Sequence, residues 1–560
     1  MTSTLGQTEE SEGRSTPKPE IQRKLEPANQ VCRYLLEMFS VPLLRSHATV
    51  SLVDRHRLQL YHANRSVILV SSAINFSGGD GLEKFIATII AFRRFSHEQN
   101  GIFDTLVPKD ASLVQDSNFA VENKVVQKGS VLVFAGNGSD ENFEVELGET
   151  ISRDPAVVGR STAVVGATSV KWPGHELVIK VSWPGSGQVP ETDFLEKACA
   201  EANKMKDNEW AINHLPQVLH SKDVVFGRCS TLESVAHLFE DAKFTGRRFR
   251  YERRTLRVII QERLYSIKTL MNVRDIGQVF LDVACSTYIH LSPRFPCVYA
   301  RLVHRWLFDE PGILHRDLSL NNIMWRLVEE MNAEGVREQK VHGVLTDYDL
   351  SSWKEDLKKD YRSTSQQRTG TPPYMAQEIL KGTSATHLYR HDVESLLYIM
   401  LIVCGRHTIG VVGDGKKARR QVVMRKENLP YEDWFEARSY AALGKNKASF
   451  FSDREAIELS PVFEDFRPWL RDLQRDFSKG FRSKNSHEDD SEPEWRSQQA
   501  GGSVSAVAST PVPFDDETLG GRVDYSTVIE PTRSLRGVLK GLVIRYDTAS
   551  PPLPIPAGAA

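Results

Sequence analysis

The sequence lacks the features that mark secreted, zinc-dependent and membrane-spanning proteins. Its 560 residues include six cysteines, which are scattered and form no CxxC pair, so reduced thiols are expected rather than disulfides or a zinc framework. No apolar run reaches the length of about 18 residues that a membrane span needs, and the polar N-terminal stretch has no signal-peptide core. We therefore expect an intracellular protein, cytoplasmic and/or nuclear, with no membrane partner.

An excess of charge of either sign is also missing. The formal net charge is −2, which provides no general attraction to nucleic acid, and no nucleic-acid partner is expected. The hydrophobic fraction of 40% and the charged fraction of 26% are those of an ordinary globular protein. Because 560 residues exceed what one core normally organises, two or three domains are predicted.

Apolar patterning is absent at both ends of the chain and in one internal stretch. The polar residues 1–27 and the Pro-rich residues 546–560 are predicted to be disordered. Residues 484–513 are rich in Ser, Glu, Asp, Gly and Gln, which predicts a flexible insertion. Residues 28–150 contain helical and strand patterns without a catalytic constellation, so a small α+β segment of unassigned role is expected there.

The stretch GILHRDLSLNNIMWR, residues 312–326, is the most informative in the chain. Its His-Arg-Asp tripeptide ends at Asp317, and Asn322 follows five residues later. This is the spacing of a protein-kinase catalytic loop. In that loop the Asp accepts the proton of the substrate hydroxyl, while the Asn reaches a Mg²⁺ ion. The alternative for an isolated tripeptide is a chance match in a surface turn.

An acidic pair follows about thirty residues later, in TDYDLSSW. Asp347 comes directly after an apolar run and stands where a kinase needs its Mg²⁺-binding Asp. Tyr348 takes the place of the Phe in the kinase D-F-G motif, and Asp349 takes the place of the Gly. We therefore predict that Asp347 is the metal ligand and that Asp349 is a turn residue.

Two further segments follow in the order that a kinase requires. Residues 370–378, GTPPYMAQE, are close to the G-T-x-x-Y-x-A-P-E sequence that ends a kinase activation segment. Thr371 is predicted to orient Asp317, and Glu378 to take a buried acidic position. Asp392 opens an apolar helical pattern and is predicted to accept hydrogen bonds from the backbone of the catalytic loop.

Upstream, residues 157–167 occupy the place of a phosphate-covering loop. Its predicted ATP contacts are Gly159, Ser161 and Thr162. The loop is poor in glycine, and side chains with a Cβ make a close approach of backbone N–H groups to phosphate harder. The apolar run LVIK then ends at Lys180, which matches the kinase lysine that binds the α- and β-phosphates.

A helical pattern after Lys180 provides its expected partner. Glu191 is favoured because apolar residues follow it at i+3 and i+4, and Glu196 is the alternative. The strand RVIIQERL fits a hinge that binds adenine through the backbone of Glu262 and Leu264.

Six elements in this order predict an α+β chain with a bilobal protein-kinase-like fold. A β-rich N-lobe and hinge are expected over residues 151–264, and a mostly helical C-lobe over residues 265–545. The N-terminal α+β segment is additional to both lobes. The predicted catalytic residues are Lys180, Asp317, Asn322 and Asp347, of which Asn322 and Asp347 are the predicted metal ligands.

The same residues carry a closer resemblance. The segments RWLFDEPGILHRDLSLNNIM, LTDYDLS, GTPPYMAQEIL and YRHDVESLLYIM resemble the fungal-type protein kinase family, over roughly residues 30–545. The resemblance implies a bilobal kinase domain interrupted by family-specific segments, and it says little about the substrate. From the kinase motifs, ATP and Mg²⁺ are the expected cofactors, and an unidentified protein is the expected substrate. His315 and Arg316 are assigned structural and regulatory roles, because Arg316 beside Asp317 is placed to bind a phosphate added to residues 362–371.

Departures from the kinase pattern leave alternatives open. Ser319 stands where Ser/Thr kinases have a lysine that neutralises the γ-phosphate. Because the core catalytic residues are present, and because Thr371 favours hydroxyl acceptors of the Ser/Thr class, we expect a Mg·ATP-dependent Ser/Thr protein kinase. A nucleotide-binding pseudokinase or scaffold is the alternative. A small-molecule phosphotransferase of the aminoglycoside-kinase type is a weaker one, since those enzymes lack a segment like GTPPYMAQE.

Overall fold

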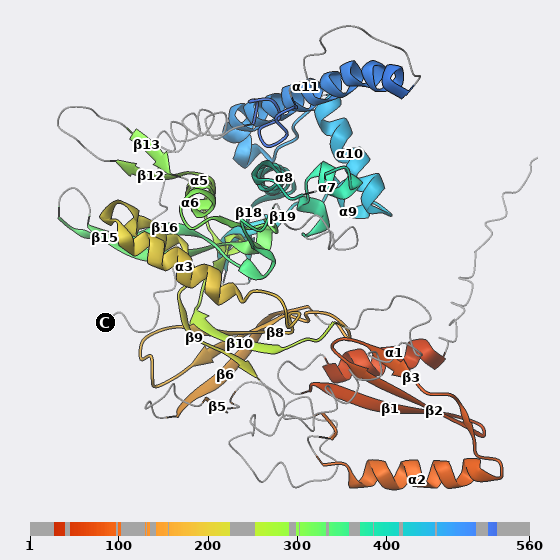
Figure 1. Ribbon diagram of the computed structural model, residues 1–560. Helices are drawn as coiled ribbons and strands as arrows, with labels where there is room; N and C mark the ends of the chain where they lie inside the picture. Colours follow the sequence, from red (N-terminus) through yellow and green to blue (C-terminus); the bar gives the residue numbers. More distant parts are fainter. Residues whose placement is uncertain are drawn as a thin grey trace, which may run out of the picture.

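The protein is described from a computed structural model of residues 1–560 (Figure 1). The described residues are 27–39, 45–96, 99–101, 129, 131–134, 142–154, 156–224, 252–289, 298–301, 303–331, 335–357, 370–384, 386–413, 418–453, 456–499 and 513–523. The predictions for residues 1–26, for most of the activation segment before Gly370 and for the C-terminal tail concern residues outside these ranges.

The first elements along the described chain make up an N-terminal unit. It consists of α1 (Pro27–Phe39), β1 (His47–Asp54), β2 (Arg57–Asn64), β3 (Ile68–Val70), β4 (Ile74–Asn75) and α2 (Asp80–Arg94). β2 pairs antiparallel with each of the other three strands. On α1, Val31, Leu35 and Phe39 recur at intervals of four residues, so they form one apolar face, which packs in a core with Ala48 and Tyr61 of the sheet.

A six-stranded antiparallel sheet follows, in the order β5-β6-β7-β8-β10-β9. Its strands are β5 (Val131–Phe134), β6 (Phe143–Arg153), β7 (Ala163–Thr168), β8 (Leu177–Ser182), β9 (Val218–Val224) and β10 (Leu256–Glu262). Every residue of β8 is buried, because the strand is central. α3 (Glu191–Lys204) and the 3₁₀ helix η3 (Lys206–His214) connect β8 to β9. A domain boundary at residue 150 would cut β6 in two.

The rest of the chain is mainly helical, with short strands. Its helices are α5 (Val273–Cys285), α6 (Val303–Asp309), α7 (Gln377–Lys381), α8 (Tyr389–Arg406), α9 (Asp433–Glu436), α10 (Tyr440–Ser452) and α11 (Arg467–Gln499). The 3₁₀ helices are η4 (Ile267–Thr269), η5 (Leu320–Asn322), η6 (Tyr348–Leu350), η8 (Pro372–Tyr374) and η10 (Pro461–Phe466). All of α8 is buried, so it is the central helix of this region.

Three antiparallel pairings and one three-stranded sheet complete the region. The strands are β11 (Tyr265–Ser266), β12 (Ser286–Ile289), β13 (Val298–Arg301), β14 (Ile313–Leu314), β15 (Ile323–Met331), β16 (Arg337–Leu345), β17 (Ser352–Trp353), β18 (His407–Val412) and β19 (Arg419–Met424). β15 and β16 follow the catalytic-loop sequence and form a hairpin. Gly343 of β16 lies against α5, where an added Cβ would come within 2.5 Å of the Val279 carbonyl oxygen.

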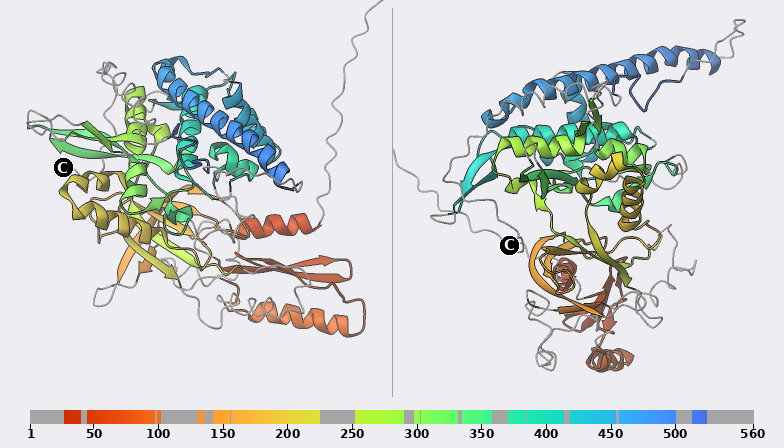
Figure 2. Two further views of the ribbon diagram at one scale, coloured as in Figure 1. Left: turned by 45° about the horizontal axis from the view of Figure 1, so that its top comes forward. Right: turned by 90° about the vertical axis from the view of Figure 1, so that its left-hand side faces the viewer.

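The six-stranded sheet lies between the N-terminal unit and the helical region (Figures 1 and 2). Helices and strands are thus mixed along the chain, which confirms the expected α+β content. In the part of the chain that the structure describes, no helix is long and apolar enough to cross a membrane.

The first part of the predicted flexible insertion is helical instead. Residues 484–499 continue α11 without a break, and residues 500–512 lie outside the described ranges. Extending an existing helix adds a hydrogen bond per residue without repeating the cost of nucleation, so a polar composition does not have to end it. Lys484 also anchors this stretch, because its Nζ lies 2.8 Å from Glu378 and 2.6 Å from Asp516.

Candidate active site

The centre of the candidate site is the ammonium group of Lys180 on β8. Its Nζ lies 2.8 Å from the carboxylate of Glu191, at the start of α3, and 2.7 Å from that of Asp347, which follows β16. Asp347 adopts a left-handed conformation with φ 65°, so the chain turns sharply after β16. Two elements far apart in sequence therefore bring their carboxylates to one lysine.

Asp349 is the third carboxylate in this cluster. The sequence predicted a turn residue, but the side chain is only 2% exposed, and its Oδ2 lies 3.2 Å from Lys180 Nζ. The left-handed turn at Asp347 and the single turn of η6 direct it inward. Neither Asp349 oxygen accepts a hydrogen bond from the described residues, so the carboxylate is held in the site by charge.

Three carboxylates around one ammonium group strongly perturb the site. Burial alone would lower the pKa of Lys180, but the charges of Asp347, Asp349 and Glu191 outweigh it and raise that pKa well above its ordinary value. Burial also opposes ionisation of Asp347, yet the charge of Lys180 lowers the pKa of Asp347 to about 2. Burial raises the pKa of Glu191 to about 7, although the charge of Lys180 opposes this rise. Three carboxylates thus face a single ammonium group, and oxygen ligands of this kind suit a divalent cation.

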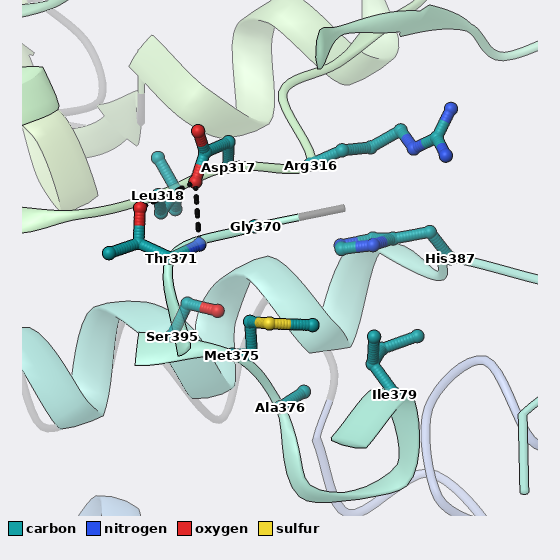
Figure 3. Close-up of a pocket in the computed structure, with 10 residues that line it drawn as sticks. All are labelled: Arg316, Asp317, Leu318, Gly370, Thr371, Met375, Ala376, Ile379, His387 and Ser395. Carbon is teal, nitrogen blue, oxygen red and sulfur yellow. Dashed lines mark hydrogen bonds between the residues drawn. The ribbon is translucent and has the colours of Figure 1, made fainter. Parts of the chain in front are cut away.

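Asp317 lies on the loop between β14 and η5, and its carboxylate is held by Thr371. Oδ1 accepts hydrogen bonds from the Thr371 backbone N–H at 3.0 Å and from its hydroxyl at 3.1 Å. Figure 3 shows Asp317 and Thr371 beside a small pocket between the catalytic loop, residues 370–379 and α8.

Asn322 donates from Nδ2 to the Asp317 carbonyl oxygen at 2.7 Å. Burial and the nearby charge of Asp347 raise the pKa of Asp317 to about 6.

The backbone of the same loop is fixed by His315 and Asp392. His315 Nε2 lies 2.9 Å from the carbonyl oxygen of Thr346, which joins the loop to the end of β16. Asp392, in the first turn of α8, accepts a hydrogen bond from the Arg316 N–H at 3.0 Å and contacts His387 and His304. The Arg316 side chain itself hydrogen-bonds Ser352 on β17.

Glu378 is the centre of a second ionic network, away from Lys180. Its carboxylate pairs with Arg390 on α8, whose side chain is fully buried, and with Lys484 on α11. Asp516, from the last described segment, pairs with the same two cations. Although burial opposes its ionisation, hydrogen bonds and cationic neighbours hold the pKa of Glu378 below its usual range.

The remaining predicted residues lie in the six-stranded sheet or on the loops beside it. Gly159, Ser161 and Thr162 lie in the connection between β6 and β7. Glu262 ends β10, and its N–H donates to the Gln217 carbonyl oxygen at 3.0 Å. Leu264 is buried between β10 and β11.

Sequence reasoning missed two arginines near this site. Arg160, between the predicted ATP contacts of the β6–β7 loop, has Nη1 3.9 Å from Asp349 Oδ2. Arg65, from the N-terminal unit, is buried and donates to the Ala156 carbonyl oxygen. The only sequence signal at Arg160 was its position next to Gly159, and no pattern connected Arg65 with a loop 91 residues later.

Comparison with models of known protein families gives a match. A family model described as fungal protein kinase matches residues 15–241 and 300–404, which include Lys180, Glu191, Asp317, Asp347 and Asp392. No curated protein matches the chain. Because the matched residues make up more than half of the sequence and include the residues assembled around Lys180 and Asp317, the chain belongs to the fungal protein kinase family.

Proposed function

We propose that this member of the family is an active, Mg·ATP-dependent protein kinase that phosphorylates Ser or Thr hydroxyls. The observation that carries the proposal is the contact of Lys180 Nζ with Glu191 at 2.8 Å and with Asp347 at 2.7 Å. A kinase requires the lysine–glutamate ion pair and the metal-binding Asp to be in place together.

The positions of Asp317, Thr371 and Lys180 support transfer of the γ-phosphate to a hydroxyl group in one step. Asp317 orients the substrate hydroxyl and accepts its proton while the hydroxyl oxygen bonds to the γ-phosphorus. The bond from that phosphorus to the β,γ-bridging oxygen breaks, and ADP leaves with the electron pair. Thr371 keeps Asp317 aimed through the hydrogen bonds at 3.0 and 3.1 Å, and Lys180 binds the α- and β-phosphates.

The donor set around Lys180 fits a magnesium ion. Glu191, Asp347 and Asp349 bring carboxylate oxygens within 4.8 Å of one another, and oxygen donors are the ligands that Mg²⁺ prefers. Asn322 and Asp347 are the proposed ligands. When bound with ATP, Mg²⁺ neutralises charge on the β- and γ-phosphates.

The wider assignment follows from the same proposal. We take the six-stranded sheet with α3 as the N-lobe and the helical region around α8 as the C-lobe, with the N-terminal unit as an additional segment. Gly159, Ser161 and Thr162 are proposed to cover the phosphates, and the backbone of Glu262 and Leu264 to contact adenine. The acceptor protein is not identified.

Transfer of labelled γ-phosphate to the chain itself or to a generic protein acceptor tests the proposal. The wild type is compared with Lys180→Met, Asp317→Asn and Asp347→Asn, and with Asp193→Asn, an exposed acid on α3, as the matched control. We expect the first three to lose at least about 10²-fold in rate and the control to keep wild-type activity. Equal labelling by all five proteins would refute the assignment.

A nucleotide-binding scaffold is the second candidate, because Ser319 is uncharged where a phosphate-neutralising lysine is expected. Mg·ATP binding by the wild type, without transfer to any acceptor, would favour it over the kinase.

A further inference from the structure

The catalytic loop is short of positive charge where phosphate would be transferred. Ser319 is buried, two residues after Asp317, and supplies no cation. The carboxylates of Glu191, Asp347 and Asp349 already surround Lys180. Charge develops on the oxygens of the phosphoryl group as it is transferred, so a further cation facing this cluster would stabilise the transition state.

Arg160 is a cation in that position. Its side chain is 32% exposed, and Nη1 lies 3.9 Å from Asp349 Oδ2. From its position on the β6–β7 loop, Arg160 therefore faces the carboxylate cluster. Its charge limits the rise in the pKa of Asp317 and adds to the lowering of the pKa of Asp347, so Arg160 lies within electrostatic range of both carboxylates. A guanidinium presents a planar fork of N–H donors that matches phosphate oxygens.

The local backbone conformation orients the side chain of Arg160. Gly159 has φ 125° and Ser161 has φ 43°, so both neighbours of Arg160 have positive φ. A serine in the left-handed region is uncommon and is held there by its surroundings. The Arg160 carbonyl oxygen accepts a hydrogen bond of 2.7 Å from the Trp183 N–H, which ties the loop to the end of β8.

The N-terminal unit holds the other side of this loop. The Gly159 N–H donates to the Arg65 carbonyl oxygen at 2.9 Å, and Arg65 Nη1 donates to the Ala156 carbonyl oxygen at 2.5 Å. The Arg65 guanidinium lies 4.4 Å from the centre of the Phe39 ring. Val157 packs against the same apolar core that α1 forms with the sheet of the N-terminal unit.

We propose that Arg160 binds the γ-phosphate and supplies the positive charge that Ser319 lacks, and that the N-terminal unit positions it by holding residues 156–159. The proposal rests on the proposed function and adds a phosphate-binding residue to it. The chemical step is unchanged: the γ-phosphoryl group passes to the substrate hydroxyl oxygen, and the proton passes to Asp317. Arg160 only stabilises the oxygens of the γ-phosphate, while Arg65 is a positioning residue that touches no substrate.

Nucleotide preference is the direct test, because ADP lacks the phosphate that Arg160 binds. Dissociation constants for the non-hydrolysable ATP analogue AMP-PNP and for ADP, both with Mg²⁺, are measured by calorimetry on the full chain. Arg160→Gln is expected to lower the preference for AMP-PNP over ADP by about tenfold, the size of a charge-assisted contact. Arg160→Lys should keep part of it, and Arg153→Gln, an exposed arginine on the same hairpin, should keep all of it.

The role of the N-terminal unit is tested by a double-mutant cycle. Two substitutions are tested: Arg65→Gln, and the milder Val157→Ser, which leaves the buried Arg65 guanidinium in place. Each should lower the preference for AMP-PNP over ADP when Arg160 is present, but not in the Arg160→Gln background. A purely structural role would lower affinity for both nucleotides equally. Additive losses of preference would therefore overturn the positioning claim.

The outcomes separate this inference from the proposed function. A wild type that binds neither nucleotide contradicts both. A wild type that prefers AMP-PNP, with the preference unchanged in Arg160→Gln, contradicts only the role of Arg160.

Discussion

At the scale of single residues, the two acids of the TDYD sequence have distinct positions. Asp347 is in direct contact with Lys180 at 2.7 Å, whereas Asp349 is more deeply buried and lies 3.2 Å from the same Nζ. Both carboxylates therefore contribute to the negative field of the site, although only Asp347 is the expected ligand from the kinase pattern. Substitution should separate a metal ligand from a residue that acts through charge.

Asp347→Asn should reduce transfer by at least about 10²-fold at any Mg²⁺ concentration, because the proposed ligand is lost. Asp349→Asn should keep measurable transfer but require several-fold more Mg²⁺ for half-maximal rate, because one charge leaves the cluster. Rates are measured over a Mg²⁺ titration at saturating ATP. Identical Mg²⁺ dependence of the two variants would contradict the distinction.

Thr371 offers a second test at this scale. Thr371→Val removes the hydroxyl hydrogen bond to Asp317 but keeps the side-chain shape, and a hydrogen bond to a charged group is worth about 1.5–3 kcal/mol. We expect kcat to fall about tenfold or more with little change in the KM for ATP. Thr371→Ser keeps the hydroxyl and serves as the control. An unchanged kcat in the valine variant would show that the backbone N–H alone orients Asp317.

At the scale of elements, α10 supports the segment beneath the catalytic loop through one buried lysine. Lys447 is fully buried, and its Nζ donates to the carbonyl oxygens of Pro373 at 2.9 Å and Met375 at 2.6 Å. Burial lowers the pKa of Lys447 well below its ordinary value. Its hydrogen bonds connect α10 to η8, next to Thr371.

Lys447→Met keeps most of the volume but leaves the two carbonyl oxygens unpaired. The cost should be about 1–3 kcal/mol of unfolding free energy, together with a higher KM for the acceptor protein. Chemical denaturation and steady-state kinetics measure the two effects. Lys445→Met, at an exposed position of the same helix, is the control. A Lys447 variant with the stability of the control would refute the supporting role.

At the scale of the whole molecule, the Glu378 network joins segments that are distant in sequence. It connects α7, α8, α11 and the described segment around Asp516. Removing one partner of a buried ion pair typically costs about 3–5 kcal/mol, because the other charge is left uncompensated. Glu378→Gln removes one of the two carboxylates that pair with the buried Arg390 and leaves Asp516 alone to balance Arg390 and Lys484.

The pH dependence of this effect has a definite sign. The folded-state pKa of Glu378 lies below its ordinary value of 4.5, so its stabilising effect is fully present above that value and is lost as the pH falls below it. The wild type should therefore exceed Glu378→Gln by about 3 kcal/mol at pH 7, with a smaller difference at pH 4. Urea denaturation at both pH values measures this. A difference that grows toward pH 4 would contradict it.

Much of this molecule could be predicted from sequence because the motifs are local. Asp317 and Asn322 lie on one short loop, and the periodic pattern after Glu191 indicated a helix. The family and the mixed α+β content are confirmed, whereas the roles of individual site residues stay predictions. The inward position of Asp349 depends on the left-handed backbone at Asp347, which no pattern encodes.

The contacts that sequence reasoning missed are long-range. Arg65 meets Ala156 across 91 residues, and Lys484 meets Glu378 across 106. Such pairs depend on how separate units pack, and that information is spread over many residues of both surfaces. The polar composition after Lys484 likewise predicted flexibility, because it carries no sign that α11 continues from the apolar residues before it.

The most direct test of the central claim is transfer of the γ-phosphate of ATP by the purified full chain, with Mg²⁺ or with EDTA, for the wild type and for Asp317→Asn. We predict Mg²⁺-dependent labelling of Ser or Thr by the wild type and at least about 10²-fold less by the variant. Labelling that is equal in the two proteins, or labelling that persists in EDTA, would contradict the account.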